Sequence, residues 1–267
     1  MSEQIEKDKI YNCDCLEGMK HIPNASIDLV VTSPPYDNLR TYGGVLDDWN
    51  FDKFKPIAKE LARILKDGGV IVWVVADATL DGSETGTSFR QALYFMELGL
   101  SLYDTMIWEK PAAPSPTEGR YYDAFEYMFV ICKGKRPNAL NFIADRKNIS
   151  VGSVYEKETR SCKEDRKTTG KRKAVPEYSR RFNVWTVPNT TNNTGHPAVF
   201  PLKLSEAHIL SWSNEGDLVL DPFMGSGTTA VACIKEKRHF IGFELNKDYY
   251  DKACRRIDAE RRQLSLF

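Results

Sequence analysis

Short apolar runs alternate with amphipathic helical patterns along most of this chain. Residues 27–31 (IDLVV) and 70–76 (VIVWVVA) are apolar almost throughout and rich in β-branched side chains. Between them, residues 51–66 place apolar side chains at helical spacing, and the pattern stops at Gly68 and Gly69. Strands without polar alternation must be covered on both faces, as in parallel sheets whose crossover helices pack on either side. The sequence therefore predicts an α/β fold with a mainly parallel sheet.

The same alternation returns after a gap in the middle of the chain. Further strands are expected over residues 102–108, 127–132, 218–220 and 240–243, and further helices over residues 89–98, 201–213, 228–236 and 247–262. A chain of 267 residues buries enough apolar surface to fold without disulfide or metal staples. The six cysteines include no CxxC pair, so no metal site is expected. The charged N-terminus and the lack of an apolar run of about 18 residues predict a cytoplasmic protein without membrane contact.

The middle of the chain loses periodicity and gains positive charge. Residues 133–181 hold 15 Lys or Arg against 6 Asp or Glu, a net charge of +9 in a chain whose total charge is zero. Such a segment is either a solvated loop or linker, or a surface that binds nucleic acid. Its place between two halves of one sheet favours an inserted functional segment. We therefore divide the chain into residues 1–132, 133–195 and 196–267.

A glycine loop stands between a strand and a helix in the C-terminal part. Residues 218–230 read LVLDPFMGSGTTA, in which Gly225 and Gly227 allow close approach of the backbone to a ligand. The helix that starts at Thr228 presents free N–H groups there. Glu244 ends the next strand, where a carboxylate can accept hydrogen bonds from the hydroxyls of a ribose. The unit predicts a ribose-bearing cofactor; only 23 residues follow Glu244, too few for the second nucleotide-binding half that a nicotinamide cofactor requires.

A proline-stiffened loop, residues 32–36 (TSPPY), directly follows the apolar run at 27–31. It therefore lies at the carboxyl edge of the sheet, where open α/β folds bind ligands. Two prolines fix the backbone and leave carbonyl acceptors beside the Ser33 hydroxyl. Acceptors next to the aromatic ring of Tyr36 suit a planar ring that carries an amino group, because Ser33 and the Pro34 carbonyl can accept its protons while Tyr36 stacks on the ring.

Taken together, TSPPY, a basic middle segment and DPFMGSGTT resemble the S-adenosylmethionine-dependent amino DNA methyltransferases in their β-type motif order. Further resembling segments are residues 12–17 (NCDCLE), 107–111 (IWEKP), 125–135 (FEYMFVICKGK) and 196–201 (HPAVFP). Each motif is degenerate, but their joint order across about 230 residues is specific. The resemblance implies a Rossmann-like methyltransferase fold with a mainly parallel seven-stranded sheet, helices on both faces, a circularly permuted motif order and an inserted target-recognition region at residues 133–195.

The resemblance also implies roles for individual residues. The catalytic residues would be Ser33, Pro34, Pro35 and Tyr36. The residues that bind S-adenosylmethionine would be Asp14, Cys15, Thr32, Ser33, Lys203, Asp221, Pro222, Phe223, Gly225, Ser226, Gly227, Thr228, Glu244 and Leu245, with Asp221 facing either the ligand or the helix N-terminus. By their charge and position, the candidates for DNA binding are Arg40, Lys171, Arg172, Lys173, Arg180 and Arg181.

Within the resembling family, Ser before Pro-Pro usually accompanies methylation of cytosine N4, whereas Asp or Asn accompanies methylation of adenine N6. The sequence therefore favours a site-specific cytosine-N4 DNA methyltransferase that flips its target base out of the duplex. Adenine-N6 methylation is the close alternative, and an inactive DNA-binding homologue is a second one. The resemblance implies double-stranded DNA as partner, and leaves open a cognate restriction endonuclease and either a monomer or a homodimer.

Overall fold

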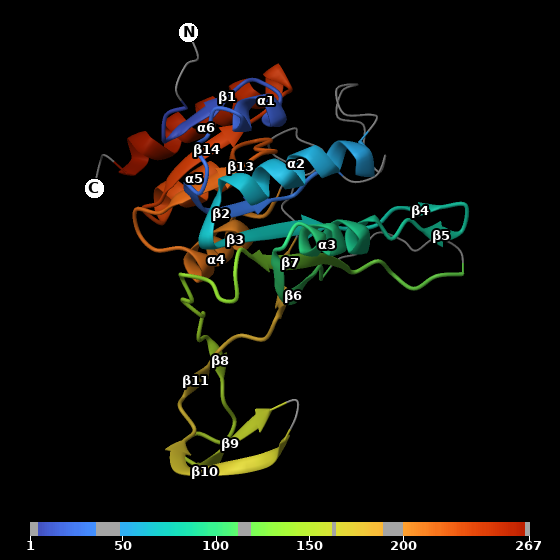
Figure 1. Cartoon of the computed structure of the whole chain (residues 1–267). Coiled ribbons are helices and arrows are strands. Elements are labelled where there is room, and N and C mark those ends of the chain that lie inside the picture. The colour runs from blue at the N-terminus through green and yellow to red at the C-terminus, as the bar shows by residue number, and fades with distance from the viewer. Residues whose placement is uncertain (1–4, 36–48, 112–118, 162–163, 189–199, 265–267) are drawn as a thin grey trace. The chain divides into compact units, whose positions relative to one another are not determined.

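The computed structural model describes residues 5–35, 49–111, 119–161, 164–188 and 200–264, without the side chains of 157–171 and 264 (Figure 1). The chain divides into two compact units. The sheet unit consists of Met1–Asn141 and Asn183–Phe267, and the hairpin unit consists of Phe142–Phe182. The hairpin unit lies inside the basic segment 133–195, whereas the flanks of that segment belong to the sheet unit.

The sheet unit is built on eight described strands in the order β1-β14-β13-β2-β3-β7-β6-β12. The strands are β1 (Lys9–Tyr11), β2 (Ile27–Thr32), β3 (Leu65–Val75), β6 (Ser101–Glu109), β7 (Phe125–Cys132), β12 (Val184–Thr186), β13 (Leu218–Asp221) and β14 (His239–Phe243), beside a small hairpin of β4 (Thr79–Leu80) and β5 (Ser83–Glu84). Neighbouring strands pair in parallel except at β7, which is antiparallel to both β3 and β6. The expected mainly parallel α/β sheet is confirmed, with β12 as a strand that the apolar pattern did not predict.

Helices cover both faces of the sheet (Figure 1). They are α1 (Cys15–Met19), α2 (Phe51–Ile64), α3 (Thr87–Glu97), α4 (Leu202–Trp212), α5 (Thr228–Lys235) and α6 (Lys247–Leu264). Contacts join α1 to α2 and α2 to α3, and separately α4 to α5 and α5 to α6. Three helices therefore line each face, as right-handed crossovers between parallel strands require. No helix in the described part of the chain is long and apolar enough to cross a membrane.

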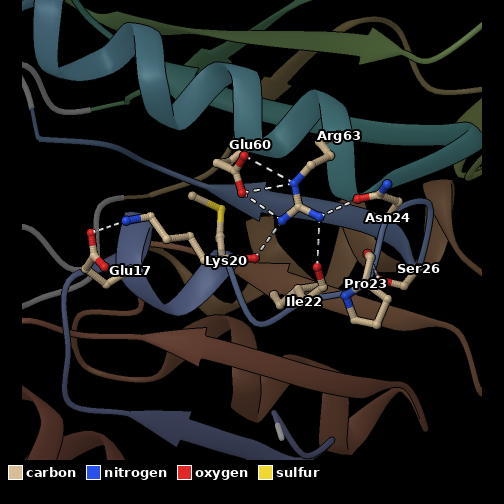
Figure 2. A network of polar contacts seen from close by, with 9 residues as sticks. Glu17, Lys20, Ile22, Pro23, Asn24, Ser26, Glu60 and Arg63 are labelled. Carbon is tan, nitrogen blue, oxygen red and sulfur yellow. Dashed lines mark hydrogen bonds and ion pairs between the residues drawn. The ribbon is translucent and has the colours of Figure 1, made fainter. Parts of the chain in front are cut away.

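Arg63 of α2 fixes the loop that leads into β2 (Figure 2). Its guanidinium donates to the carbonyls of Met19 (2.8 Å) and Ile22 (3.0 Å) and to Oδ1 of Asn24 (2.6 Å), while Glu60 of the same helix accepts from its other N–H groups. A planar guanidinium with five donors suits this fan of acceptors. The start of β2, at the edge opposite to its Ser-Pro-Pro sequence, is thereby anchored to α2.

The end of α2 differs from the expectation that the helix continues to the glycines at 68–69. The helix ends at Ile64, and Leu65 is already extended and pairs with Ile27 of β2. A register shift in the pairing of β2 with β3 follows between Ile27 and Leu29. The side chains of Leu65 and Ile27 are both fully buried, so pairing within the core ends the helix before the glycines do.

The hairpin unit consists of two antiparallel pairs. β9 (Val154–Ser161) pairs with β10 (Glu164–Ala174), and β8 (Arg146–Lys147) pairs with β11 (Tyr178–Ser179). The pairing of β9 with β10 contains two register shifts. The basic segment is thus folded rather than a structureless linker over its described residues.

Candidate active site

The candidate site is at the carboxyl edge of the sheet, where β13 and β2 lie side by side. From β2 the chain crosses through α2 to β3 on one side, and from β13 it crosses through α5 to β14 on the other. The strand order therefore diverges between β13 and β2, and such switch points are where open α/β sheets bind ligands. The loop that begins at Ser33 and the loop that begins at Pro222 leave these two strands at the same edge. The expected meeting of the two distant chain segments is confirmed by the pairing of β13 with β2.

A hydrogen bond joins the ends of the two strands. The hydroxyl of Thr32, the last residue of β2, donates to Oδ1 of Asp221, the last residue of β13, over 2.7 Å. The other carboxylate oxygen accepts from the hydroxyl of Thr229 in α5 (2.6 Å), and Oδ1 also accepts from the backbone N–H of Phe223 (3.0 Å). Burial raises the pKa of the Asp221 carboxyl, and these three hydrogen bonds oppose the shift. Asp221 thus faces the glycine loop and the first turn of α5.

The glycine loop has the backbone that its sequence predicts. Gly225 and Gly227 have φ angles of 55° and 81°, in the left-handed region that glycine adopts without strain. A Cβ on Gly227 would lie 3.1 Å from Cβ of Ala253 in α6, so the loop also approaches α6 closely. Phe223 packs edge-on against Trp49 and Trp73, with ring centroids 5.3 and 6.3 Å apart. Aromatic packing and left-handed turns together give the loop a defined shape.

Glu244 follows β14 and reaches back to the glycine loop. Its Oε2 accepts from the backbone N–H of Gly225 (2.8 Å), and its Oε1 accepts from the N–H of Asn246 (2.7 Å). The residue is 9% exposed. Burial raises the pKa of the Glu244 carboxyl, the two backbone hydrogen bonds oppose this, and the negative charge of Asp221 adds to it.

Residues after β1 complete this edge of the sheet. The side-chain amide of Asn12 donates to the carbonyls of Glu244 (2.9 Å) and Leu245 (3.1 Å), which ties the ends of β1 and β14 together. Asp14, a predicted cofactor ligand, caps α1 by accepting from the N–H groups of Leu16 (2.8 Å) and Glu17 (3.3 Å). Its side chain is exposed at the same edge.

Cys15 and Lys203 differ in their exposure. Cys15 packs in the hydrophobic core, where burial raises the pKa of its thiol. Lys203 is exposed in the first turn of α4, and α4 precedes β13 along the chain, so its first turn lies on the side of the carboxyl edge.

The proline loop is described only in part. Ser33 is half-buried, and Pro34 and Pro35 are buried. The predicted catalytic Tyr36 and the predicted DNA contact Arg40 lie outside the described residues. Ser33 and the two prolines are therefore the members of the predicted acceptor cluster that the structure brings beside the glycine loop.

The sequence reasoning missed Arg256 of α6. Its guanidinium donates to the carbonyl of Ser226 (3.2 Å) and to the hydroxyl of Thr228 (2.9 Å), so it supports the glycine loop from the side of α6. Burial lowers the pKa of Arg256. Its place within the charged run of α6 gives no signal of this contact, whereas Thr229, the second missed residue, stands within the recognised loop motif.

In the hairpin unit, several predicted DNA contacts have partners within the unit. Arg181 forms an ion pair with Asp145, whose pKa it lowers, with Nε 3.1 Å from Oδ1. The guanidinium of Arg180 lies over the ring of Phe142, 4.2 Å from its centroid. Arg172 and Lys173 are exposed on β10 opposite Glu156 and Tyr155, and Lys171 lies in the same strand.

The arrangement suits a cationic ligand with a ribose. Asp221 and Glu244 are two buried carboxylates at the ends of adjacent strands, and neither has an ion-pair partner among the described residues. Their negative potential favours a positively charged ligand, as a sulfonium is. The glycine loop, its close approach to α6 and the Glu244 carboxylate beside it fit S-adenosylmethionine. Within the described residues, no group of three or more His, Cys, Asp or Glu side chains could hold a metal ion.

Comparisons with known proteins agree on one family. A family model for N6/N4 methyltransferases, described as "DNA methylase", matches residues 27–255. The chain is 49% identical over 251 residues to the orphan methyltransferase M.BamHII of Bacillus amyloliquefaciens, covering 89% of this chain and 91% of that protein.

Two solved structures are similar over most of their length. One is the PvuII DNA methyltransferase (cytosine-N4-specific), at a TM-score of 0.69 and 25% identity over 94% of this chain and 86% of that one. The other is a DNA modification methylase of Thermus thermophilus complexed with S-adenosyl-L-methionine, at a TM-score of 0.64 and 25% identity over 94% and 93%. The chain therefore belongs to the S-adenosylmethionine-dependent DNA methyltransferases that modify the amino group of cytosine N4 or adenine N6.

Proposed function

We propose that this enzyme methylates N4 of cytosine within a short sequence of double-stranded DNA. The observation that carries the proposal is the position of Ser33-Pro34-Pro35 at the end of β2, beside the glycine loop that follows β13. Ser before the two prolines favours cytosine over adenine as the target. The similarity to a structure named as cytosine-N4-specific supports the same choice.

In this proposal, the proline loop binds the target amine and orients its lone pair. An exocyclic amine is a weak nucleophile because its lone pair is delocalised into the ring. By accepting its two protons, the Ser33 hydroxyl oxygen and the Pro34 carbonyl would hold the nitrogen pyramidal, with the lone pair toward the glycine loop. Bound S-adenosylmethionine supplies the methyl group on a sulfonium. As the N–C bond forms, the S–C bond breaks, and the amine then loses a proton to water, so the main role of the loop is positioning.

The cofactor contacts in the proposal are divided between the strand ends. Glu244 would accept hydrogen bonds from the ribose hydroxyls, Gly225 and Gly227 would admit the cofactor to the loop, and Asp14 and Lys203 would contact its two ends. These assignments use the side chains that the structure exposes, or holds as acceptors, along the carboxyl edge.

DNA binding is assigned to the hairpin unit. A net charge of +9 over residues 133–181 suits contacts to phosphates, which makes affinity fall steeply with salt. The target base must leave the helical stack, at a cost of a few kcal/mol, and stacking on the ring of Tyr36 would recover part of that.

The test is mass spectrometry of nucleosides from DNA of a host that has no amino-methyltransferase of its own, with and without expression of this chain. N4-methylcytosine is the expected product. N6-methyladenine alone would support the adenine alternative, and neither base, together with no cofactor binding in calorimetry, would support an inactive homologue. Expression of Glu244→Ala in the same host is the control, because it should yield much less of either product.

A further inference from the structure

The Asp221 carboxylate, a predicted cofactor ligand, has its hydrogen-bonding capacity directed into the protein. The residue is 5% exposed, and its two oxygens accept from the Thr32 hydroxyl, the Thr229 hydroxyl and the backbone N–H of Phe223. A carboxylate has about four acceptor sites, so three are used within the protein. Little of Asp221 is left to contact a ligand.

The Thr32 contact differs from the other two in what it connects. Phe223 and Thr229 follow Asp221 by 2 and 8 positions, so their bonds shape the glycine loop and the start of α5 locally. Thr32 is 189 positions away and is followed directly by Ser33. The bond from Thr32 to Asp221 therefore links the loop that would hold the amine to the loop that would hold the methyl donor.

We infer that Thr32 and Asp221 are positioning residues, which set the separation between the target amine and the cofactor methyl without touching either. This inference rests on the proposed function of the two loops. Methyl transfer needs the reacting atoms in line at near-contact distance, and a misplacement of about 1 Å can reduce the rate by about 100-fold. A short bond between buried side chains at the roots of both loops is well placed to control that distance, since a buried hydrogen bond has no competing water.

The chain offers a matched pair of variants. Thr32→Val and Thr229→Val each remove one buried hydroxyl of the same kind from Asp221, and each keeps the shape of the side chain. They act on different oxygens of the carboxylate, and Thr32 alone of the two precedes the proline loop. A role limited to stability predicts similar losses in both variants, whereas positioning predicts a loss of rate in Thr32→Val alone.

The experiment measures three quantities on the full-length enzyme: the dissociation constant of S-adenosylmethionine by calorimetry, the single-turnover rate of methyl transfer to substrate DNA, and the melting temperature. For Thr32→Val we expect a rate about 10- to 100-fold lower, with a cofactor dissociation constant within about threefold of the wild type. Thr32→Ser keeps the hydroxyl and should recover most of the rate. Thr229→Val should retain the rate within about threefold, although its melting temperature falls.

Equal loss of rate in Thr32→Val and Thr229→Val would overturn the inference in favour of a purely structural brace. Weakened cofactor binding with an unchanged rate in Thr32→Val would overturn it in favour of direct cofactor contact. If Thr32→Val does not fold, Thr32→Ala compared with Thr32→Ser makes the same test. A wild-type enzyme without any methyl transfer would instead refute the proposed function, so the two failures are distinguishable.

Discussion

The hydroxyl of Thr32 donates to Oδ1 of Asp221 over 2.7 Å, although 189 positions separate the two residues. The bond depends on the parallel pairing of β2 with β13, which aligns Leu29 with Val219 and Val30 with Leu220. A permuted order of motifs along the chain therefore still gives one site in space, because the two strands that carry the loops are neighbours.

Replacement of Glu244 by Gln should weaken cofactor binding. The amide keeps the shape of the side chain but loses one acceptor oxygen and the negative charge. Hydrogen bonds to a charged group contribute roughly 1.5–3 kcal/mol each, so we expect the dissociation constant of S-adenosylmethionine to rise at least tenfold in calorimetry. Asp258→Asn, an exposed change of the same kind on α6, is the control and should bind as the wild type does. Equal affinities of Glu244→Gln and the wild type would remove Glu244 from the site.

Cofactor affinity should also fall in acid. Burial raises the pKa of Glu244, and ribose hydroxyls prefer the ionised carboxylate, so affinity is full above this raised pKa and is lost as the pH falls through it. The same shift makes the ligand-free fold bind this proton more tightly than the unfolded chain does. The contribution of Glu244 to the free energy of unfolding therefore increases as the pH falls from the raised pKa to the ordinary value. Calorimetric titrations across pH should show this loss in the wild type and a flatter profile in Glu244→Gln.

Substitution of Gly227 by Ala should destabilise the fold more than the same change at Gly216. Both glycines have φ of 81°, so both variants incur left-handed strain of roughly 1 kcal/mol. A Cβ at Gly227 also meets Ala253 at 3.1 Å, whereas the space around Gly216 is open within 4 Å. Urea unfolding should therefore give a larger loss of unfolding free energy for Gly227→Ala. Equal losses would show that α6 yields to the added methyl group without cost.

Arg256→Met should loosen the glycine loop from the side of α6. The change keeps an extended apolar stem but removes the donors to Ser226 and Thr228. We expect a cofactor dissociation constant several-fold higher and a lower melting temperature. The neighbouring Arg255 is exposed, so Arg255→Met should change neither quantity. A similar effect of both variants would point to net charge rather than to the loop contact.

Charge removal on β10 should reduce the salt dependence of DNA binding. Arg172 and Lys173 are exposed, and each phosphate contact contributes about 0.9 to the slope of log affinity against log salt concentration. Replacing both by Ala should lower that slope by about 2, measured by fluorescence anisotropy with a DNA duplex. Lys59→Ala on α2 removes an exposed charge from the sheet unit and serves as the control. An unchanged slope in the double variant would place the DNA contacts elsewhere.

The apolar pattern was sufficient to predict the strands and helices of the sheet. β2 and β13 are buried along nearly their whole length, so their sequences must be apolar and are easy to recognise. β9 and β10 had no such signal. They form a two-stranded ribbon of charged residues, in which backbone pairing rather than a buried face holds the strands together.

The candidate site was predictable as a neighbourhood but not as a network. Two loops that follow adjacent parallel strands must meet at one edge, so Ser33 and Gly225 could be placed together from the sequence. The partner of Thr32 could not, because it depends on the register of β2 against β13. Arg256 was beyond reach for a similar reason, since its contact depends on how α6 packs on the glycine loop.

The hairpin unit interrupts the sheet unit between Asn141 and Asn183 and is compact by itself. Its internal pairs, such as Arg181 with Asp145 and Arg180 with Phe142, are made within that unit. Evolution can therefore exchange this insert as a cassette while the methyl-transfer chemistry stays untouched. New sequence preferences would then arise by replacement of some forty residues, without redesign of the enzyme's core.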